Sequence, residues 1–596
     1  MELVRSFGTL FLLLCVILFF QQAAGRTRKF EFNVAYMSVN KLCRATRIVA
    51  VNGQFPGPSI RIQQGDKVIV RVHNMIRSNI TIHWHGVQQR LSCWQDGPAF
   101  ITQCPIQERN SFTYRFRVDQ VGTLFWHAHA AWLRGTVHGA FIIEPVTRRP
   151  RPYPFPQPFR DETIILGDWF VNDLLEEEER AIVSGGAPDM SNAFIINGKP
   201  GPLFNCSATS YSKSFTHEEN THKIGFIPGE AYLLRIINAA LEQDLFFSIA
   251  NHTMTVVEID ASYTKHLTVT EFLITPGQTV SVLVKASQHG GSYYMAASPW
   301  RSGGALFQPT VALGIIEYIT PHGNFSLMPV LHNLPNPDDK ALGQKFQKLL
   351  RSLNSKQYPE QVPQLADRRL FHVVSLNVKP CSPGIICSGP AGLRLSSSIN
   401  NVSFVSPKTS SILEAYYNRI PGVFTADFPD KPPVPYDYVG KAFDISDLFS
   451  ETGTRVSVIP YGANVQLVLQ TTINLANDSH PFHLHGFDFY IVGEGHGNFD
   501  GARDERKFNL VDPPRRNTAL IPIKGWIALR FKADNPGMIL SIHSASNLMS
   551  LRPGTWLFHC HLDGHLTWGL EMAFIVLNGE GPNQTLPSPP KHRPKC

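Results

Sequence analysis

Apolar and polar positions alternate along short segments of this chain, and glycine and proline separate the segments. Alternation with a period of two is typical of strands that bury one face, and Gly or Pro marks the turns between strands. The chain contains 44 of each residue. The clearest strand patterns follow a glycine in three places: residues 65–74 (GDKVIVRVHN), 229–238 (GEAYLLRIIN) and 462–470 (GANVQLVLQ). These patterns predict an all-β protein built from sandwich or barrel domains.

The alternating segments belong to longer repeats. The turn NGQFPGP at residues 52–58 returns as NGKPGP at 197–202, and GTLFWHAH at 122–129 returns as GTWLFHCH at 554–561. Since 596 residues are too many for one core, the repeats predict separate domains. We expect a Pro-rich first linker at 145–158 and a second linker at 321–367 that contains a helical pattern at 338–353. The three expected domains cover residues 26–145, 159–320 and 368–596.

The N-terminus has the pattern of a secretory signal peptide. Arg5 precedes an apolar run at residues 10–20, and Ala23, Ala24 and Gly25 offer small residues for cleavage. The run is short for a bilayer span, although a signal anchor is the alternative. We expect residues 1–25 to be removed and the mature chain to be soluble and exported to the extracellular space or cell wall. Sites for N-glycosylation, which support export, begin at Asn79, Asn205, Asn251, Asn324, Asn401, Asn477 and Asn583.

The formal net charge of the chain is +7, and loss of Glu2 and Arg5 with the signal peptide leaves it unchanged. A basic exported protein is attracted to polyanions, so weak association with acidic cell-wall polysaccharide is one interpretation. A charge that serves only solubility fits equally well. We expect a monomer, with no partner nucleic acid and no membrane association.

Four His-x-His pairs carry the strongest chemical signal. Residues two apart in a strand point to the same face, so each pair presents two imidazoles to one point. One such pair is commonly incidental, but each outer domain holds two, and the middle copy of the repeat (GSYYMAAS, 291–298) has Ala and Ser instead. The pairs predict a metal cluster between the first and third domains and none in the second, and imidazole suits copper, iron, zinc and nickel. They are His83/His85, His127/His129, His483/His485 and His559/His561.

Cys560 lies between the two histidines of the last pair and must point to the opposite face of the strand. There His480 and His565 can complete the two-His, one-Cys set of a blue copper electron-transfer site. A small buried core residue is the alternative interpretation for Cys560 alone. In the first interpretation the backbone joins a one-electron site directly to the cluster.

The chain resembles the multicopper oxidases, and plant laccases in particular, from about residue 28 to residue 596. The matching motifs are HWHG at His83, WHAHAAWLRGTVHGA at Trp126, HPFHLHG at His480, HCHLDGHLTWGL at His559, DGPAFITQCPIQ at Asp96 and GEGHGNFD at Gly493. The resemblance implies three cupredoxin-like Greek-key domains that hold four coppers.

Family roles can be placed on the matching residues. The resemblance assigns His480, Cys560 and His565 to the type 1 copper, and His83 with His483 to the type 2 copper. The type 3 pair would take His85, His127, His129, His485, His559 and His561.

Two further positions have roles by resemblance. Leu570 takes the axial position beside the type 1 copper, where an apolar residue raises the reduction potential relative to Met. Simple packing of Leu570 is compatible with that role. Asp96 resembles the family's acid near the cluster, a relay for the protons that O₂ reduction consumes, and a structural hydrogen-bonding role is the alternative interpretation.

Six of the eight cysteines other than Cys560 fall into pairs by resemblance. The implied disulfides are Cys43–Cys206, Cys104–Cys596 and Cys381–Cys387, pairings that spacing alone does not establish. Cys15 leaves with the signal peptide, and Cys93 remains as a candidate free thiol.

One block departs from the family pattern. Laccases pass directly from Asn-Pro-Gly into Thr-Trp, whereas here residues 538–554 (MILSIHSASNLMSLRPG) separate Gly537 from Thr555. The block is apolar and has no partner in the other repeats, so we interpret it as retained intron or misassigned exon sequence. A slip of the following strand by one residue would exchange its two faces.

The resulting expectation is a copper-dependent oxidoreductase that oxidises phenols, of the monolignol or flavonoid type, with O₂ as acceptor, in lignin polymerisation or degradation. An ascorbate oxidase is the nearest alternative enzyme, and Leu570 in place of Met argues against it. A ferroxidase would need carboxylates beside the type 1 histidines, and no obvious set is present. A copper-poor, non-enzymatic wall protein stays open because of the 538–554 block.

Overall fold

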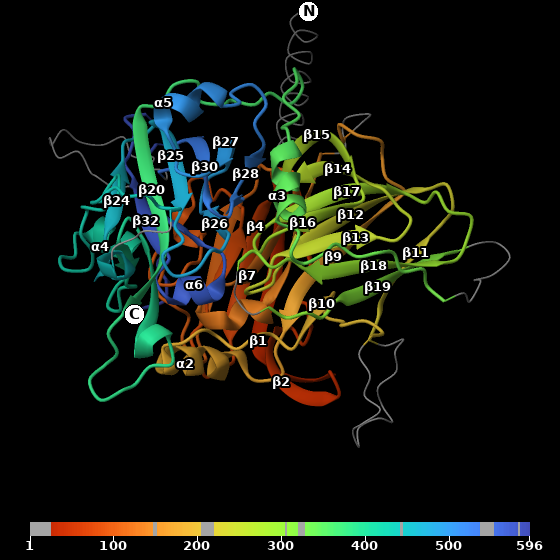
Figure 1. Ribbon diagram of the computed structural model, residues 1–596, viewed down its shortest axis with the longest axis horizontal. Helices are drawn as coiled ribbons and strands as arrows, with labels where there is room; N and C mark the ends of the chain where they lie inside the picture. Colours follow the sequence, from red (N-terminus) through yellow and green to blue (C-terminus); the bar gives the residue numbers. More distant parts are fainter. Residues whose placement is uncertain are drawn as a thin grey trace, which may run out of the picture.

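The computed structural model describes residues 25–146, 152–203, 220–303, 307–319, 328–440, 445–536, 554–581 and 584–596. Strands dominate, and they form three pairs of sheets that follow one another along the chain. In Figure 1 the first pair (red to orange) lies between the second pair (yellow to green, right) and the third (cyan to blue, left). The all-β prediction is confirmed.

The first sandwich pairs two four-stranded sheets, in the orders β2-β1-β4-β6 and β3-β8-β7-β5. Strand β1 runs parallel to β4 and antiparallel to β2. Trp84 and Trp126 fill the space between the sheets together with Phe32 and Phe141. The strands are β1 (Thr27–Lys41), β2 (Arg44–Val51), β3 (Ile60–Gln63), β4 (Lys67–Asn74), β5 (Ile82–His85), β6 (Ser111–Arg117), β7 (Gly122–Ala128) and β8 (His138–Glu144). Two short 3-10 turns, η1 (Cys93–Gln95) and η2 (Ala131–Gly135), accompany them.

The second sandwich is larger, with sheets in the orders β10-β9-β12-β17-β14-β15 and β11-β19-β18-β13-β16. Its core contains Phe226, Tyr232, Phe247 and Met295. The strands are β9 (Arg160–Trp169), β10 (Ala193–Ile196), β11 (His222–Phe226), β12 (Ala231–Asn238), β13 (Leu245–Ile249), β14 (Met254–Ile259), β15 (Ser262–Val269), β16 (Glu271–Ile274), β17 (Thr279–Lys285), β18 (Ser292–Pro299) and β19 (Ala312–Tyr318). Helix α2 (Leu174–Ser184) follows β9, and α3 (Lys340–Leu349) follows the sandwich.

The third sandwich has sheets in the orders β23-β22-β21-β20-β25-β30-β27-β28 and β24-β32-β31-β26-β29. The first comprises β20 (Arg368–Lys379), β21 (Arg394–Ile399), β22 (Val402–Phe404), β23 (Glu451–Gly453), β25 (Asn464–Thr471), β27 (Phe489–His496), β28 (Arg515–Arg516) and β30 (Gly525–Lys532). The second comprises β24 (Val456–Ile459), β26 (His480–Leu484), β29 (Thr518–Ile521), β31 (Gly554–Cys560) and β32 (Glu571–Val576). Helices α4 (Ile412–Asn418), α5 (Gly501–Asp504) and α6 (Asp563–Thr567) and the turns η3 (Pro390–Gly392), η4 (Ile445–Leu448) and η5 (Glu505–Lys507) lie in the loops.

The alternating segments form equivalent strands of the three sandwiches, β4, β12 and β25. The helical pattern at 338–353 forms α3, which begins where the Asp339 side chain accepts a hydrogen bond from Leu342 N at 2.8 Å. A local cap of this kind satisfies a backbone donor that the first turn leaves free.

The repeated Asn-Gly turn also has a third copy that the sequence pattern did not reveal. Asn52 and Asn197 adopt positive φ angles of 55° and 48°, and each side chain bridges two backbone groups of the neighbouring antiparallel strand, β1 and β9 respectively. Asn400, with φ 50°, makes the same pair of bonds in the third sandwich although the next residue is Asn401 rather than Gly. Asn tolerates this left-handed conformation better than most residues, so the turn survives without glycine.

Two predicted segments lie almost wholly outside the described residues. The predicted signal peptide, residues 1–25, is described only at Gly25, and the 538–554 block only at Gly554. Within the described ranges, no helix has the length and apolar character needed to cross a membrane.

Candidate metal centre

One group of candidate ligands lies within the third sandwich, on one face of β31. His480 begins β26, Cys560 ends β31, and His565 lies on α6. Cys560 Sγ lies 3.9 Å from His480 Nδ1 and 3.6 Å from His565 Nδ1, and the two Nδ1 atoms are 3.1 Å apart. Three donor atoms therefore converge on one buried point, in the trigonal two-His, one-Cys set that suits a blue copper ion.

The second group lies where the first and third sandwiches meet. Strands β5 and β7 pair so that His83 is opposite His127, and β26 and β31 pair so that His483 is opposite His559. Each outer sandwich thus places an equivalent strand pair, β5/β7 in the first and β26/β31 in the third, where the two sandwiches meet. The second histidine of each pair completes the set of eight: His85, His129, His485 and His561.

The eight imidazoles divide into overlapping clusters of three whose ligand atoms lie within 4.8 Å of one another. His85 Nδ1 lies 3.5 Å from His127 Nε2 and 3.2 Å from His561 Nε2. The clusters are His85/His127/His561, His129/His485/His559 and His83/His85/His483. Each of the first two draws on both outer sandwiches, so the arrangement can hold metal only when the two pack together.

Hydrogen bonds to backbone carbonyls set which ring nitrogen is free. His83 Nδ1 donates to Asp96 O and His483 Nδ1 donates to Asn517 O, both at 2.8 Å. His127 and His559 make equivalent bonds through Nδ1 to the carbonyls of residues 128 and 560. A neutral imidazole that donates through Nδ1 keeps the lone pair on Nε2 for a metal.

Buried nitrogen atoms without a partner support that assignment. Among the described residues, Nε2 of His83, His129 and His483 is buried and has no hydrogen-bond partner. An unsatisfied buried polar atom costs free energy, on the order of 1–3 kcal/mol each. Bound metal ions would satisfy all three atoms, so the residues present fit a metal cluster.

Burial keeps these ligands in the form that binds metal. It lowers the pKa of His559 to about 3 and of His565 to about 4, and it lowers the pKa of His485 well below the ordinary value. Repulsion from neighbouring imidazoles adds to the shift at His485. The rings are therefore neutral near pH 7. Burial raises the pKa of the Cys560 thiol well above its ordinary value, so a metal must displace its proton.

Asp96 bridges the two halves of the cluster. Its Oδ2 accepts a hydrogen bond from His485 Nδ1 at 2.8 Å, and Oδ1 lies 3.4 Å from His83 Nδ1. The side chain is fully buried. One carboxylate thus orients a ring from each outer sandwich.

Residues outside the predicted set also hold the centre in place. Arg134, on η2, forms a 3.0 Å ion pair with Asp563 and contacts the ring of His561, with Nη1 2.6 Å from Nδ1. Arg134 lies inside the WHAHAAWLRGTVHGA motif, but no local pattern reveals its distant partners. Thr518 Oγ1 lies 3.0 Å from His85 Nε2 and 3.2 Å from His483 Nδ1.

The strand that carries Thr518 is fixed by the second sandwich. Asp260 forms a bidentate ion pair with Arg516 at 2.9 and 3.2 Å and accepts backbone hydrogen bonds from Asn517 and Thr518. Both side chains are 1% exposed. The middle sandwich has no histidines at its equivalent strand pair, where Ser248 faces Ala296. Its contacts with the site, of which this ion pair is one, therefore support residues that adjoin the cluster rather than supply ligands.

Leu570 is fully buried in the same core as Cys560. Its carbonyl accepts from Cys560 N at 3.0 Å and its N–H donates to His565 O at 3.0 Å. The residue is thus tied by its backbone to two members of the first group.

A pocket of about 490 Å³ opens beside His565. Its lining combines apolar side chains, such as Leu562 and Phe307, with the carboxyl groups of Glu242 and Asp244. Burial raises the pKa of Glu242 to about 8 and that of Asp244 to about 7. A flat apolar molecule that carries a hydroxyl group matches this combination.

Strand β31 keeps the register that separates the two groups. Phe482 pairs with Cys560 and His483 with His559, so Cys560 faces His480 rather than the cluster. The one-residue slip considered for the 538–554 block is not seen. Gly554 lies close to Pro536, since a Cβ added to Gly554 would lie 2.7 Å from Pro536 O.

Disulfides join Cys104 to Cys596 and Cys381 to Cys387. The implied partner of Cys43, residue 206, lies outside the described residues. Cys93 is a buried free thiol whose Sγ donates to Thr555 O at 3.3 Å.

Comparison with known proteins places the chain in a family. Models of multicopper oxidase domains match residues 33–148, 160–321 and 427–580. The chain is 44% identical to Laccase-11 of Arabidopsis thaliana, over 99% of this chain and 100% of that one. It is 45% identical to Laccase-12 of Oryza sativa subsp. japonica, over 96% of each chain.

Solved structures show the same fold. The laccase of Botrytis aclada superposes with a TM-score of 0.69 at 25% identity, covering 93% of this chain and 88% of the other. Fet3p, a multicopper oxidase that functions in iron import, gives a TM-score of 0.69 at 22% identity over 92% and 90% of the two chains. The chain therefore belongs to the multicopper oxidases, as a copper-dependent oxidoreductase of the plant laccase type.

Proposed function

We propose that the chain is a phenol-oxidising laccase with four coppers, and that its two groups of buried ligands divide the reaction between them. The observation that carries the proposal is the position of Cys560, whose side chain joins His480 and His565 while His559 and His561 on the same strand face the cluster. Copper, when bound, accepts single electrons from a phenol at the type 1 site and delivers four electrons to O₂ at a three-copper cluster, which yields water.

The chain's residues take distinct roles in this proposal. His480, Cys560 and His565 hold the type 1 copper, and His83 and His483 hold the type 2 copper through the free Nε2 atoms. The type 3 coppers take three imidazoles each, from the sets His85/His127/His561 and His129/His485/His559.

The pocket beside His565 is the proposed phenol site. Asp244 lines it, and its Oδ2 accepts a hydrogen bond from Ser479 Oγ at 3.1 Å. Asp244 Oδ1 is buried without a partner among the described residues. A substrate hydroxyl that donates to Oδ1 would satisfy this atom, and the apolar lining excludes water from the aromatic ring. Monolignols and flavonoids have the required shape and phenolic hydroxyl group, in keeping with a role in lignin polymerisation or degradation.

Asp96 is the proposed proton relay at the cluster. Reduction of O₂ to water consumes four protons, and the carboxylate contacts His83 and His485 from within a fully buried site. Its two oxygens can pass a proton without a change of position.

The test is a joint measurement on purified, copper-supplied protein. We expect about four coppers per chain, strong absorption at roughly 600 nm from the copper–thiolate pair, and about four phenol molecules oxidised for each O₂ consumed. Ascorbate oxidised in clear preference to every phenol would favour the ascorbate oxidase alternative. Copper-free protein that folds normally and oxidises neither substrate would favour a non-enzymatic wall protein.

A further inference from the structure

A second groove, remote from the copper ligands, runs along the outer face of the first sandwich. It lies between strands β1, β4 and β6 and the C-terminal tail, and its volume is about 950 Å³. None of its lining residues lines the pocket beside His565. The charged and titratable side chains that line it are Lys29, Glu31, Arg71, Arg115, Lys591 and His592.

Strand register places the basic residues across the sheet in order. Lys29 on β1 pairs with Ile69 on β4, and Ile69 pairs with Arg115 on β6. Arg71 lies two residues beyond Ile69, so its side chain leaves the same face. Neighbouring strands lie about 4.8 Å apart. Lys29 and Arg115 therefore lie on either side of Ile69, one strand spacing away in each direction, and Arg71 lies on the middle strand opposite Glu31 and Thr113.

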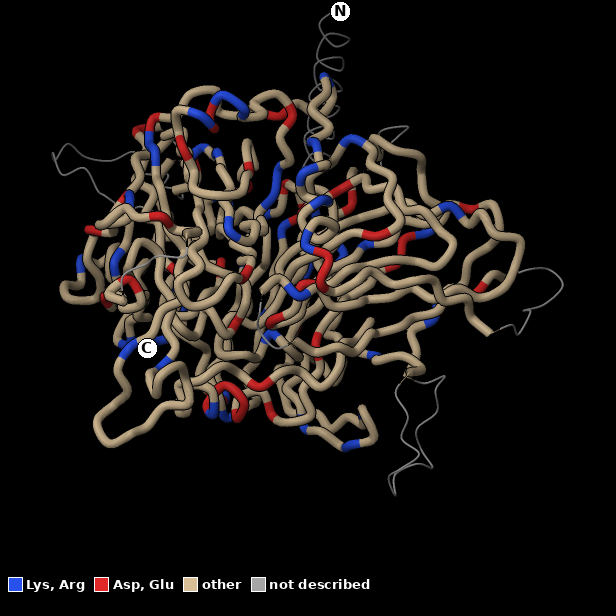
Figure 2. Tube along the Cα trace, in the orientation of Figure 1, with Lys and Arg blue, Asp and Glu red and all other residues tan. Residues whose placement is uncertain are grey.

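Four of these cations have no carboxylate partner within ion-pair distance among the described residues. In the part of the chain that the structure describes, no ion pair within 4.0 Å involves Lys29, Arg71, Arg115 or Lys591. Glu31 lies opposite Arg71 in the strand pairing, but its carboxylate is within ion-pair distance of His73, at 3.5 Å. By contrast, Arg61 on the neighbouring sheet pairs with Asp161 at 2.9 Å. Along the backbone trace in Figure 2, basic and acidic residues are interspersed.

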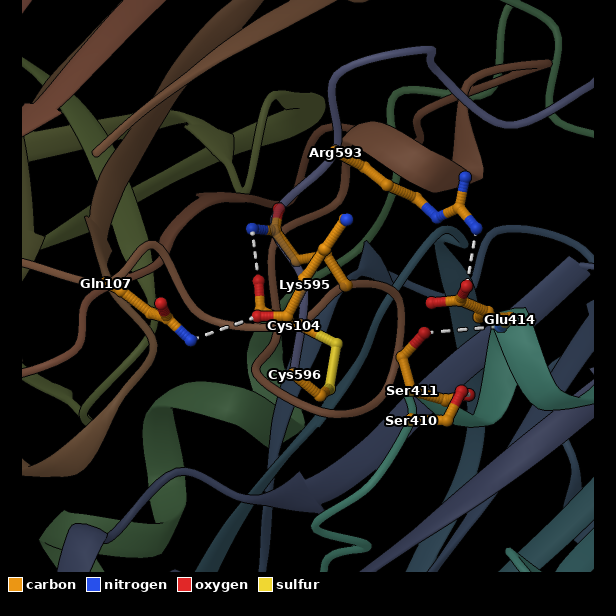
Figure 3. The surroundings of a disulfide bond; sticks show 9 residues. Cys104, Gln107, Ser410, Ser411, Glu414, Arg593, Lys595 and Cys596 are labelled. Carbon is orange, nitrogen blue, oxygen red and sulfur yellow. Dashed lines mark hydrogen bonds and ion pairs between the residues drawn. A yellow bond between two sulfur atoms is a disulfide. The ribbon is translucent and has the colours of Figure 1, made fainter.

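The tail that forms one wall of the groove is anchored. A disulfide joins Cys596 to Cys104, and Arg593 forms an ion pair with Glu414 on α4 (Figure 3). Lys591 therefore stands on a fixed segment, and the groove exists before any ligand binds. Preformed sites lose less conformational entropy on binding.

We propose that this groove binds an acidic polysaccharide, a chain of uronic acid sugars whose carboxylates pair with the exposed Lys and Arg side chains. Guanidinium groups match carboxylates in charge and geometry, and an extended polymer can contact several strands at once. Single-stranded nucleic acid suits the groove less well because it needs exposed aromatic faces for stacking. The groove's two rings, Phe30 and Phe112, pack into the core instead.

In this proposal, part of the chain's net positive charge lies in the groove and serves to bind the polysaccharide. A groove of this kind would hold the enzyme on an acidic matrix while the phenol pocket stays free. Because the groove shares no residue with the copper ligands, binding and oxidation are expected to be separable by mutation.

The test measures binding of the copper-loaded protein to polygalacturonate at low salt. The groove variant is the triple substitution Arg71→Gln, Arg115→Gln and Lys591→Gln. Exposed ion pairs each contribute roughly a 1.4- to 5-fold factor in affinity, so we expect Kd to rise about tenfold. Restoring charge with Arg71→Lys, Arg115→Lys and Lys591→Arg should recover most of the binding, and the wild-type affinity should fall steeply with added salt.

A matched control removes the same charge elsewhere. Lys356, Lys431 and Arg506 are exposed and lie outside the groove, and the triple Gln variant at these positions should change Kd less than twofold. Equal weakening by both triples would overturn the proposal in favour of a net-charge effect. Equal affinity for an uncharged galactan, or tighter binding of a single-stranded oligonucleotide, would also overturn it. Phenol oxidation should be unchanged in both triples, which checks the fold.

Discussion

The two faces of strand β31 support sites of different construction. On one face Cys560 meets His480 and His565, all within the third sandwich. On the other face His559 and His561 meet histidines of the first sandwich. The first site can form when one sandwich folds, whereas the second needs two sandwiches in register and a third that fixes their contact. The proposed electron path and the proposed cluster therefore depend on different parts of the molecule.

The substitution Cys560→Ser tests most directly whether the sites on the two faces of β31 are independent. Serine is a poor soft ligand, so we expect complete loss of the absorption at roughly 600 nm and of phenol oxidation. The cluster face is untouched, so about three of four coppers should remain. Copper analysis and the visible spectrum measure both effects.

Cys93→Ser is the matched control for that variant, because Cys93 is also a buried free thiol but its hydrogen bond goes to the carbonyl of Thr555 rather than to a candidate copper ligand. It should keep colour and activity. Loss of all copper in Cys560→Ser would show that the two sites do not assemble independently, contrary to the comparison.

The converse variant, Asp260→Ala, disturbs the cluster through a residue of the middle sandwich. Asp260→Ala leaves the buried Arg516 guanidinium without its partner, which typically costs about 3–5 kcal/mol of stability. It also frees the strand that carries Thr518, so cluster copper should fall while the type 1 colour persists. Thermal unfolding, copper analysis and the visible spectrum measure these three results.

A second substitution gives the control. Arg516→Met together with Asp260→Ala removes the unpaired charge, so it should recover much of the lost stability. Equal loss of type 1 colour and cluster copper in Asp260→Ala would mean that the contact serves the whole molecule rather than the cluster.

Deletion of residues 538–554 tests how this block affects strand β31, which follows it. We expect the chain that lacks residues 538–554 to bind copper more completely and to oxidise phenol several-fold faster than the full chain. The physical reason is apolar exposure rather than loop closure, since each doubling of loop length costs only about 0.6 kcal/mol. The proximity of Gly554 to Pro536 O allows the ends to be joined without a shift of β31.

Expressing both forms side by side measures this difference. Equal copper content and equal phenol oxidation would refute the interpretation. Sequencing the transcript across the junction would show independently whether the block is made.

Local sequence patterns predicted the strands and the histidines that share a face. The contacts between distant segments could not be predicted from such patterns. Alternation with a period of two predicted the strands, and His-x-His predicted which imidazoles share a face, because both depend only on strand geometry. The partners of Arg134 and Asp260 could not be predicted, since they depend on how sandwiches pack. The turn at Asn400 was missed because Asn replaces the expected glycine pattern.

The smallest expected effect concerns Leu570, on the Cys560 face. Leu570→Met introduces a weak sulfur ligand at the proposed axial position, which stabilises the oxidised copper and lowers its potential. A decrease of about 59 mV corresponds to a tenfold smaller equilibrium constant for removing one electron from a phenol. The least oxidisable phenols should therefore slow first, while cluster copper and stability change little, since Leu and Met have similar volumes. Leu557→Met, buried on the same strand in a different core, is the control and should leave the potential unchanged. Redox titration of both variants decides the matter, because an unchanged potential in Leu570→Met would show that Leu570 only packs against the site.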